Sequence, residues 1–571
     1  MAGDFPSASE ADWERLAGKG KANGVADLRS RSLDGMPVGP IRPSGTGPVL
    51  AMRPPGAPWT VVQRVDGGRR DEARAAIAAA VAGGATGIEI VADSSAAAYG
   101  RGIDISTDVA DLVRDIELPV RIDAGPETPR LVEALGRERV DAAYDPLSTL
   151  AAGRATLPVE DAYAAIARLI AGGHATTAFA ADGRLWHNGG ATEVQELGIA
   201  LASAVASLRL LAGHDCPPAT AARHLGVILA ADADQFLTMG KFRAMRLLLA
   251  RLGEVAGLAA RPPIHAETSW RMLGAREPTM NLVRATTAAF AAGTGGADSI
   301  TVLSPLLDDA AFSDRMARNV QTILIEESSL PRAADPGAGS GAVEDLTERL
   351  AAAAWELFTG IEGEGGLPAA IRSGSIARAV AASRDARREA VARRRMPIVG
   401  VNVNVDPGVP PATTADDTPG PGLLAAQRLA APIEALAARA GGERIGVFRM
   451  ADAADPGLRD ALAALGFTVV PLAEPQDAAT DAATDPPRIA CIVAGDGPLD
   501  EAGATARSLR AAGVGTVVLV SGSHEAPGEA FTTAAAPDAD LVTLFHGLLD
   551  RIADRQENRQ VSKRGEQGRE S

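Results

Sequence analysis

The chain has few cysteines, few aromatic residues and no apolar run long enough to cross a membrane. Two cysteines in 571 residues, Cys216 and Cys491, build neither a disulfide framework nor a metal knuckle, and they fit a reducing cytoplasm. Aromatic residues make up only 3% of the chain, so we expect a core of aliphatic side chains. The first residues, MAGDFPSASEADWERL, are acidic and contain no apolar segment, so no signal peptide is expected.

Basic residues are outnumbered by acidic ones. Lys+Arg total 56 and Asp+Glu total 72, which gives a formal net charge of −16. This balance disfavours broad binding to nucleic acid or to an anionic membrane, although it leaves room for a local basic pocket. Apolar residues make up 46% of the chain, as in a soluble globular protein. A chain of this length is expected to form two to four domains with a large core.

Composition divides the chain into five parts. They are an arm (1–48), a main domain with trailing helices (49–404), a linker with a connecting helix (405–440), a second α/β domain (441–554) and a charged tail (555–571). The arm contains one short expected helix, 9–16, with Ser9 as its N-cap. We expect this arm to contact a partner subunit, the alternative being a disordered leader. The tail is dense in charge and is expected to be disordered.

Eight short apolar runs alternate with helical or glycine-rich segments between residues 58 and 306. They lie at 59–63, 88–92, 120–123, 140–144, 177–181, 225–230, 263–267 and 299–303. Most of them do not alternate between polar and apolar residues, which is typical of strands buried on both faces of a parallel sheet. Eight such units in about 250 residues predict a (β/α)₈ TIM barrel. A doubly wound sheet is the alternative.

The stretch 271–305 predicts one helix-to-strand step of that sheet. A loop is expected to become a helix at Pro278 and to stop at the glycines of GTGG, 293–296. This turn resembles a phosphate-binding loop only superficially, because it follows a helix and lacks the lysine of that motif. A second helix, 192–212, is predicted from apolar residues at every third or fourth position and from a capping box at its start, Thr192-x-x-Gln195.

The C-terminal third predicts a helical segment and then a small α/β domain. Helices are expected from 311 to about 395, interrupted at 331–341, followed by one more extended run at 396–403. Three spaced apolar strands are then predicted at 445–449, 489–493 and 516–520, with helices at 456–465 and 499–512. This alternation is typical of a flavodoxin-like domain.

Seven stretches, taken in order, resemble the methylmalonyl-CoA mutase family, with the features of its smaller subunit, which does not bind cobalamin. They are PWTVVQR (58–64), GGATEVQELGIALA (189–202), KFRAMR (241–246), NLVRATTAAFAAGTGGADSITVL (281–303), NVQTILIEESSL (319–330), DPGAGSGAVEDLTERLAAAAWELF (335–358) and IVGVN (398–402). The family rearranges methylmalonyl-CoA to succinyl-CoA with adenosylcobalamin. The resemblance therefore implies a barrel related to one that holds a CoA ester, and a last domain related to one that holds the corrin.

The resemblance also marks what the last domain lacks. The family places Asp-x-His-x-x-Gly after the first strand of its cobalamin domain, and that imidazole ligates cobalt. The turn from Met450 to Gly457 reads MADAADPG here and has no histidine, while His524 and His546 lie elsewhere. The turns that hold the corrin's nucleotide tail also differ, at 494–498 and 520–524. We therefore expect a degenerate cobalamin-binding domain, with adenosylcobalamin bound by the partner and none by this chain.

The barrel positions that the resemblance marks as catalytic are changed as well. A family tyrosine falls on Arg64, and a Tyr-His pair falls on Arg184 and Leu185. The family histidine hydrogen-bonds the thioester carbonyl, which leucine cannot do. The family's Asp-Pro-x-x-Gly-Ser-Tyr-Tyr reads DPGAGSGA at 335–342. We therefore expect no catalytic residue and no metal site in this chain.

Four residues are candidates for a residual pocket: His187, Glu267, Lys241 and Arg243. His187 and Glu267 near strand ends can form an acid/base pair, but we expect a buried, hydrogen-bonded histidine and a surface carboxylate. His265 is expected to be a satisfied core residue. Lys241, Arg243 and Arg246 place three cations on little more than one helical turn, where they can meet CoA phosphates or form a solvated or interface face.

Three functions follow from these features. The first, which we expect, is the small subunit of a heterodimeric methylmalonyl-CoA mutase, stabilising a homologous large chain that carries corrin, substrate and catalysis. The second is an acyl-CoA mutase with a divergent site. The third is a non-catalytic barrel that serves a related mutase or a chaperone of one.

Overall fold

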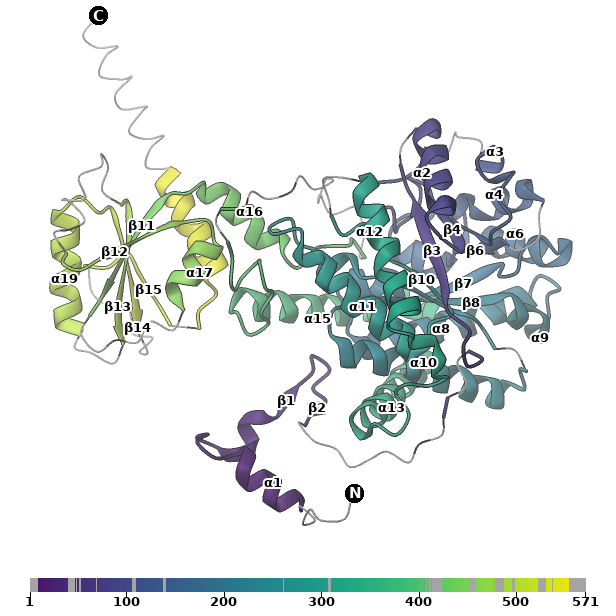
Figure 1. Ribbon diagram of the computed structural model, residues 1–571, viewed down its shortest axis with the longest axis horizontal. Coiled ribbons are helices and arrows are strands. Elements are labelled where there is room, and N and C mark those ends of the chain that lie inside the picture. Colours follow the sequence, from purple (N-terminus) through teal and green to yellow (C-terminus); the bar gives the residue numbers. More distant parts are fainter. Residues whose placement is uncertain are drawn as a thin grey trace, which may run out of the picture. The chain divides into compact units, whose positions relative to one another are not determined.

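A computed structural model describes most of the chain (Figure 1). The described residues are 9–39, 47, 49–50, 53–67, 69–104, 109–136, 140–259, 261–306, 310–406, 408–409, 412, 424–450, 453, 457–475, 477, 487–495, 499–521, 530–536 and 538–553. The chain divides into two compact units. Unit 1 comprises Met1–Met272, Leu282–Arg384 and Ala415–Gln427, and unit 2 comprises Leu273–Asn281, Asp385–Thr414 and Arg428–Ser571.

Unit 1 is built around a closed barrel of eight parallel strands. They are β3 (Thr60–Val65), β4 (Gly87–Val91), β5 (Val120–Asp123), β6 (Val140–Ala142), β7 (Phe179–Asp182), β8 (Leu225–Ala231), β9 (Ile264–Thr268) and β10 (Ser299–Thr301). Their order is β6-β5-β4-β3-β10-β9-β8-β7. The two ends meet where the amide of Ala142 donates to the carbonyl of Thr177 at 2.8 Å. All eight predicted strands and the barrel are confirmed, and the doubly wound sheet is excluded.

Helices surround this barrel, as Figure 1 shows. They are α2 (Arg70–Ala82), α3 (Val109–Val113), α4 (Thr128–Leu135), α5 (Pro146–Ala151), α6 (Val159–Gly172), α7 (Gly183–Asn188), α8 (Glu193–Ala212), α9 (Pro218–Ala221), α10 (Gln235–Ala256), α11 (Met280–Gly295) and α12 (Ala310–Thr322). At least one helix follows each strand, so the strand-to-helix loops gather at the carboxyl end of the barrel.

Helix α8 shows how sequence sets a helix start. The Thr192 hydroxyl accepts from the Gln195 amide, and the Gln195 side chain accepts from the Thr192 amide, so the predicted capping box is confirmed. By length and composition alone α8 is apolar enough to cross a membrane. However, 78% of its most apolar window is buried inside the protein, as in the core helix of a barrel wall.

Helix α11 begins two residues later than predicted, at Met280, and ends at Gly295, inside the predicted glycine segment 293–296. The glycine at 293 is required by packing, because an added Cβ would lie 2.7 Å from the Trp59 ring. Gly296 has φ +101, a backbone conformation that favours glycine at the end of a helix. These glycines therefore end the helix and admit a tryptophan, which agrees with the predicted C-cap.

The chain after α12 stays helical, as predicted. A π-helix (Ile323–Glu327) extends α12, and α13 (Gly341–Gly363), α14 (Leu367–Ser373) and α15 (Ser375–Ala392) follow. The predicted extended run at 396–403 is wrong, since these residues form turns with one isolated bridge between Val399 and Val403. Gly400 turns the chain at φ +77, and the Asn402 amide nitrogen donates to the carbonyls of Val391 and Met396, in place of a strand ladder.

Unit 2 contains a five-stranded parallel sheet. Its strands are β11 (Arg444–Arg449), β12 (Thr468–Leu472), β13 (Ile489–Gly495), β14 (Thr516–Ser521) and β15 (Thr533–Ala535). Their order, β12-β11-β13-β14-β15, is that of a flavodoxin-like domain. The three predicted strands are confirmed. Two strands were not predicted from the sequence. They are β12, which contains a proline, and β15, which has only three residues.

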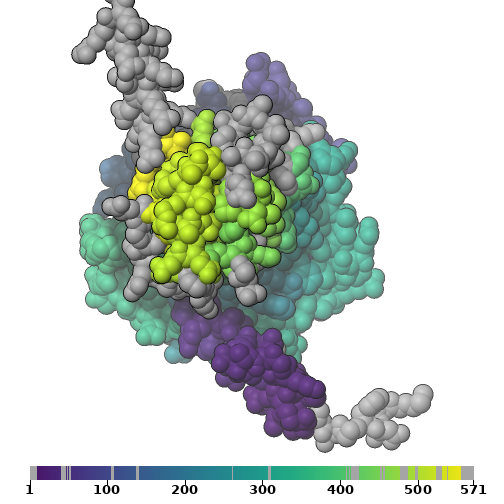
Figure 2. Space-filling model, turned by 90° about the vertical axis from the view of Figure 1, so that its left-hand side faces the viewer, coloured from purple at the N-terminus to yellow at the C-terminus, as the bar shows by residue number. Residues whose placement is uncertain are grey.

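Helices cover both faces of this sheet. Helices α16 (Ala431–Ala440) and α17 (Leu458–Ala464) pack with the side chains of one face, including Val447 and Cys491. Helix α19 (Leu499–Ala511) packs with those of the other face, including Ile492 and Leu519. The outer surface of α19 faces the viewer in Figure 2.

The described part of the arm holds α1 (Glu10–Ala17), a 3₁₀ turn (Gly24–Leu28) and a two-stranded hairpin of β1 (Ser30–Arg31) and β2 (Pro37–Val38). Ser9 caps α1 through a capping box with Asp12, so that prediction is confirmed. No residue of α1 is buried. That the arm contacts a partner subunit stays a prediction.

Candidate functional site

Arg64 stands at the carboxyl end of β3 and points into the barrel. Its side chain is 5% exposed. Its Nε donates to Asp66 Oδ2 at 2.8 Å, one Nη donates to Glu267 Oε2 at 3.3 Å, and the other donates to the Ala97 carbonyl at 2.8 Å. Burial disfavours the charged guanidinium, but Asp66 and Glu267 outweigh it and raise the pKa of Arg64. Arg64, on which the resemblance places a family tyrosine, is therefore a fixed cation.

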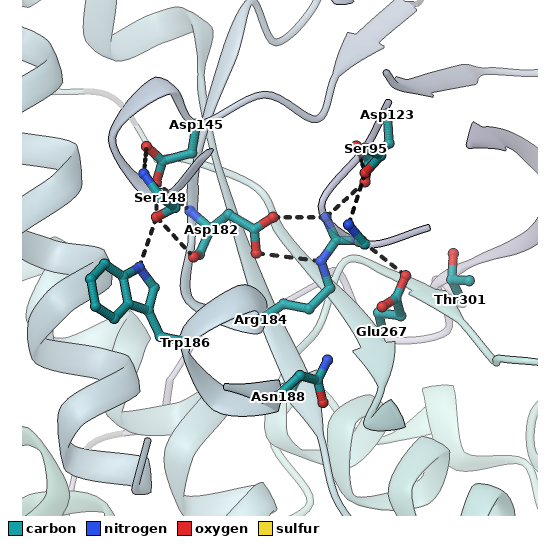
Figure 3. A network of polar contacts seen from close by, with 12 residues as sticks. Ser95, Asp123, Asp145, Ser148, Asp182, Arg184, Trp186, Asn188, Glu267 and Thr301 are labelled. Atoms are coloured by element: carbon teal, nitrogen blue, oxygen red, sulfur yellow. Dashed lines mark hydrogen bonds and ion pairs between the residues drawn. The ribbon is translucent and has the colours of Figure 1, made fainter. Parts of the chain in front are cut away.

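Arg184 reaches the same place from the first turn of α7 (Figure 3). Its guanidinium donates to Asp123 Oδ2 at 2.8 Å, to Asp182 Oδ2 at 2.7 Å and to Glu267 Oε2 at 2.9 Å. The side chain is 1% exposed. Burial raises the pKa of Asp182 to about 6, although Arg184 opposes this change. Arg184 thus ties the ends of three different strands together.

Glu267 lies between the two arginines. It is on β9, where every residue is buried, and it is 0% exposed. The prediction of a surface carboxylate is therefore wrong. Alternate residues of a strand point to the same side, which places Glu267 inside the barrel, where Arg64 and Arg184 compensate its charge.

Tyr99 covers this end of the lumen from the loop after β4. Its hydroxyl donates to Glu267 Oε1 at 2.9 Å and accepts from Asn188 Nδ2 at 2.8 Å. Its ring stacks on Trp270, with centroids 5.0 Å apart and planes at 4°, and Arg64 lies over it at 5.4 Å. The backbone of Tyr99 has φ +51, a strained value for an aromatic residue. Several side chains together hold this ring in place.

Little space remains beside these residues. The cavity there is about 50 Å³ and is lined by Arg64, Asp66, Ala98, Tyr99, Arg101, Trp270, Leu303 and Ser304. Small-molecule pockets typically measure about 300–1,000 Å³. This cavity is therefore far too small for an acyl-CoA. Leu185, on which the resemblance places the family histidine, is 7% exposed and has no polar side-chain atom to hydrogen-bond a carbonyl.

His187 belongs to a separate cluster. One ring nitrogen contacts Glu196 Oε2 at 2.8 Å and the other contacts Asp232 Oδ2 at 2.9 Å, while Lys241 Nζ donates to Glu196 at 2.5 Å. The predicted buried, hydrogen-bonded histidine is confirmed. The acid/base pair is not formed, because Glu267 bonds to the two arginines and Tyr99 instead. Burial raises the pKa of Glu196, but Lys241 and His187 outweigh it and lower the pKa to about 2.

The three cations of α10 are all buried. Lys241 is 0% exposed, Arg243 is 2% exposed and Arg246 is 9% exposed. Arg243 pairs with Asp335 of the DPGAGSGA stretch, and Arg246 pairs with Asp298 at 2.5 Å. The prediction of a solvated face is therefore wrong. The three side chains tie α10 to other parts of unit 1, and each cation is matched by a carboxylate.

His265 is buried in the barrel at 1% exposure. Its Nδ1 lies 2.8 Å from Ser299 Oγ. Its Nε2 has no hydrogen-bond partner among the described residues, so the predicted satisfied core residue is satisfied only on one side.

The network of which these residues are part was not predicted from the sequence. Tyr99, Glu89 and Asp182 were not singled out, and Arg184 was noted only as a substitution. A signal was present, because charged residues follow or end several predicted strands at Arg64, Asp123, Asp182 and Glu267. In a barrel the carboxyl ends of all strands meet at one end, so these charges had to converge.

The turn from Met450 to Gly457 has no histidine in its sequence, although the resemblance places the family's cobalt-ligating histidine there. In this turn the structure describes Met450, Ala453 and Gly457, of which Met450 and Ala453 are buried. His546 contacts Arg439 at 3.4 Å, and His524 lies outside the described residues, as do 496–498. Within the described ranges, no three His, Cys, Asp or Glu side chains are grouped to hold a metal ion. The residues present do not fit an axial imidazole ligand.

Comparisons with known proteins agree with these features. The family profile described as Methylmalonyl-CoA mutase matches residues 144–417. A methylmalonyl-CoA mutase small subunit from Streptomyces virginiae is 36% identical over 445 residues, covering 70% of this chain and 71% of that protein. The one from Propionibacterium freudenreichii subsp. shermanii is 30% identical over 448 residues, covering 70% and 69%.

A protein from Mycobacterium tuberculosis named "Probable methylmalonyl-CoA mutase small subunit" is 40% identical over 311 residues. That match covers 52% of this chain and about half, 49%, of the mycobacterial protein. The Streptomyces and Propionibacterium matches run through most of both chains. The chain therefore belongs to the methylmalonyl-CoA mutase family.

Proposed function

We propose that this chain is the small, non-catalytic subunit of a heterodimeric, adenosylcobalamin-dependent methylmalonyl-CoA mutase. It would pair in the cytoplasm with a homologous large chain that binds the corrin and the acyl-CoA. The work of this chain would be structural, namely to stabilise the large chain. The complex would interconvert methylmalonyl-CoA and succinyl-CoA as part of propionyl-CoA metabolism.

One observation carries the non-catalytic part of this proposal. Glu267 joins Arg64 and Arg184 across the carboxyl end of the barrel, and Tyr99 covers all three. The side chains fill the region where a barrel enzyme places its active site. They are paired with one another, so opening the site would expose or separate buried charges, which is costly.

The partner is argued from the relatives and from the chain itself. Relatives that match most of this chain are named small subunits, which implies a larger companion for them. In this chain, α1 has no buried residue, and Leu16 in it is 62% exposed. A helix that buries none of its own residues in this chain has no core here, which supports an arm that packs against another chain.

The test is co-expression with a homologous large mutase chain. We expect a stable complex that converts methylmalonyl-CoA to succinyl-CoA, and no turnover by this chain alone. The proposal fails if this chain stays a monomer that never captures the large chain. Turnover or corrin retention by the isolated chain would instead support a divergent mutase. Activity of the complex with a different acyl-CoA only would point to a related mutase.

A gain-of-function variant sharpens this test. The double variant Arg64→Tyr, Leu185→His introduces two of the three family residues that the resemblance places in the barrel and leaves Arg184 unchanged. We expect no turnover from the isolated variant, because Arg184, Glu267 and Tyr99 still fill the end of the barrel and because this chain is proposed to bind no corrin. Measurable isomerase activity of this variant would contradict both the filled lumen and the absence of corrin from this chain.

A further inference from the structure

Three polar atoms inside the barrel lack a hydrogen-bond partner among the described residues. They are Glu89 Oε1 on β4, Arg121 Nε on β5 and His265 Nε2 on β9. Glu89 and His265 are 0% and 1% exposed. Buried polar atoms in folded proteins are nearly always paired, with protein or with ordered water. Each atom left unpaired costs about 1–3 kcal/mol, so three together call for an explanation.

Strand geometry brings these three atoms to one region of the lumen. Asp123 on β5 and Glu267 on β9 both bond to Arg184 inside the barrel. Arg121 and His265 precede them by two residues on the same strands, and side chains two apart point to the same side. Both therefore point into the lumen, one layer nearer the amino ends of the strands.

Glu89 faces the same region. It is the direct neighbour of Arg121 in the pairing of β4 with β5. Its other oxygen, Oε2, accepts from Thr301 Oγ1 at 2.9 Å, and Thr301 in turn pairs with Glu267 in the register of β9 and β10. The carboxyl of Glu89 is thus held inside the barrel, and its Oε1 has no hydrogen-bond partner among the described residues.

The charges of this layer agree with that placement. Burial lowers the pKa of His265 well below its usual value, and the guanidinium groups of Arg121 and Arg184 lower it further. Burial and Glu267 raise the pKa of Glu89, while Arg121 opposes them. Arg121 therefore contributes to the electrostatics of both His265 and Glu89, in agreement with the strand register.

The three atoms differ in whether they donate or accept a hydrogen bond. Arg121 Nε can only donate a hydrogen bond. His265 Nε2 can accept one when Nδ1 donates to Ser299 Oγ, and Glu89 Oε1 accepts or donates according to its proton. A metal cation is disfavoured by the arginines, and an anion by Glu89. A small neutral molecule that both donates and accepts satisfies all three.

We propose that the lumen layer formed by Glu89, Arg121 and His265 holds ordered water, which enters from the amino ends of the strands. The Arg121 and Asp141 side chains are 11% and 27% exposed, so solvent reaches part of this layer. The carboxyl end is closed by Arg64, Arg184 and Tyr99. The barrel lumen therefore contains ordered water and is closed at its carboxyl end.

The test is a crystal structure of the full chain, alone or with its partner, at a resolution that shows ordered water. We expect a density peak roughly 2.7–3.2 Å from at least two of the three atoms. An empty region, or Arg121 Nε donating directly to Glu89, would overturn the proposal. So would an anomalous peak at this position after a bromide soak, since it would identify an anion site.

A variant gives an independent reading. His265→Leu removes one partner and adds apolar volume, so we expect the peak nearest Nε2 to disappear in its structure. Ser299→Ala is the matched control, because it removes the hydroxyl that binds Nδ1 and leaves Nε2 in place. A peak that survives in His265→Leu with unchanged position, or one that is lost in the control alone, would contradict the assignment. If His265→Leu does not fold, the presence or absence of the density peak in the wild-type structure still tests the proposal.

Discussion

Replacing Glu267 by glutamine removes the charge that joins Arg64 to Arg184 and keeps the shape of the side chain. Breaking one partner of a buried ion pair typically costs about 3–5 kcal/mol. Each arginine keeps another carboxylate here, Asp66 for Arg64 and Asp123 with Asp182 for Arg184. We therefore expect Glu267→Gln to lose about 3 kcal/mol of unfolding free energy, at the lower end of that range.

The assay is urea unfolding followed by tryptophan fluorescence. The five tryptophans all lie in unit 1, at Trp13, Trp59, Trp186, Trp270 and Trp355, so this signal reports on unit 1 and not on unit 2. The control is Glu254→Gln, since the Glu254 side chain is 69% exposed and lies 3.5 Å from Arg251. Exposed ion pairs contribute little, so we expect a change below about 0.5 kcal/mol.

The outcome separates a structural role from a catalytic one. A stability loss without a fall in turnover per folded complex agrees with a closed, inert barrel. The reasoning is refuted if Glu267→Gln is as stable as the Glu254→Gln control. It is equally refuted if stability is unchanged while the turnover of the complex falls, because Glu267 would then act on substrate.

Three further predictions use the same unfolding assay. Tyr99→Phe removes the hydroxyl that bonds Glu267 and Asn188 and should cost about 1–3 kcal/mol, whereas an equal stability would mean that those bonds contribute nothing. Gly293→Ala places a methyl group 2.7 Å from the Trp59 ring and should cost about 1–3 kcal/mol through overpacking, whereas an unchanged stability would show that packing does not require glycine at this position. Glu196 has a folded pKa lowered from 4.5 to about 2, so its stabilising effect is present above the unfolded pKa and is lost as pH falls from 4.5 towards 2. The slope of stability against pH in this window should flatten in Glu196→Gln, and an identical slope would rule out this carboxyl as its source.

The barrel was predictable because its strands are continuous apolar runs of similar spacing. β12 was not, because Pro471 interrupts its pattern, and the 396–403 run failed because Gly400 and the Asn402 side chain replace strand pairing with a turn. Local patterns carry no information about partners that lie far away in the chain. Glu267 looked like a surface carboxylate because the arginines that neutralise it are 203 and 83 residues distant.

The same limit applied to α10. Three cations within six residues suggested a solvated or phosphate-binding face, yet Asp335, Asp298 and Glu196 come from separate segments to meet them. His187, by contrast, was correctly expected to be buried, because one of its partners, Glu196, lies only nine residues away on the helix that follows. Predictions therefore succeeded where the chain supplied the partner locally.

The most direct test of the central claim is to count corrin in the purified complex of this chain with a large mutase chain. Absorbance of the corrin against protein concentration gives the ratio. The account predicts one corrin per heterodimer, held by the large chain, because the turn from Met450 to Gly457 has no histidine to ligate cobalt. Two corrins per heterodimer, with one released only when this chain unfolds, would contradict it.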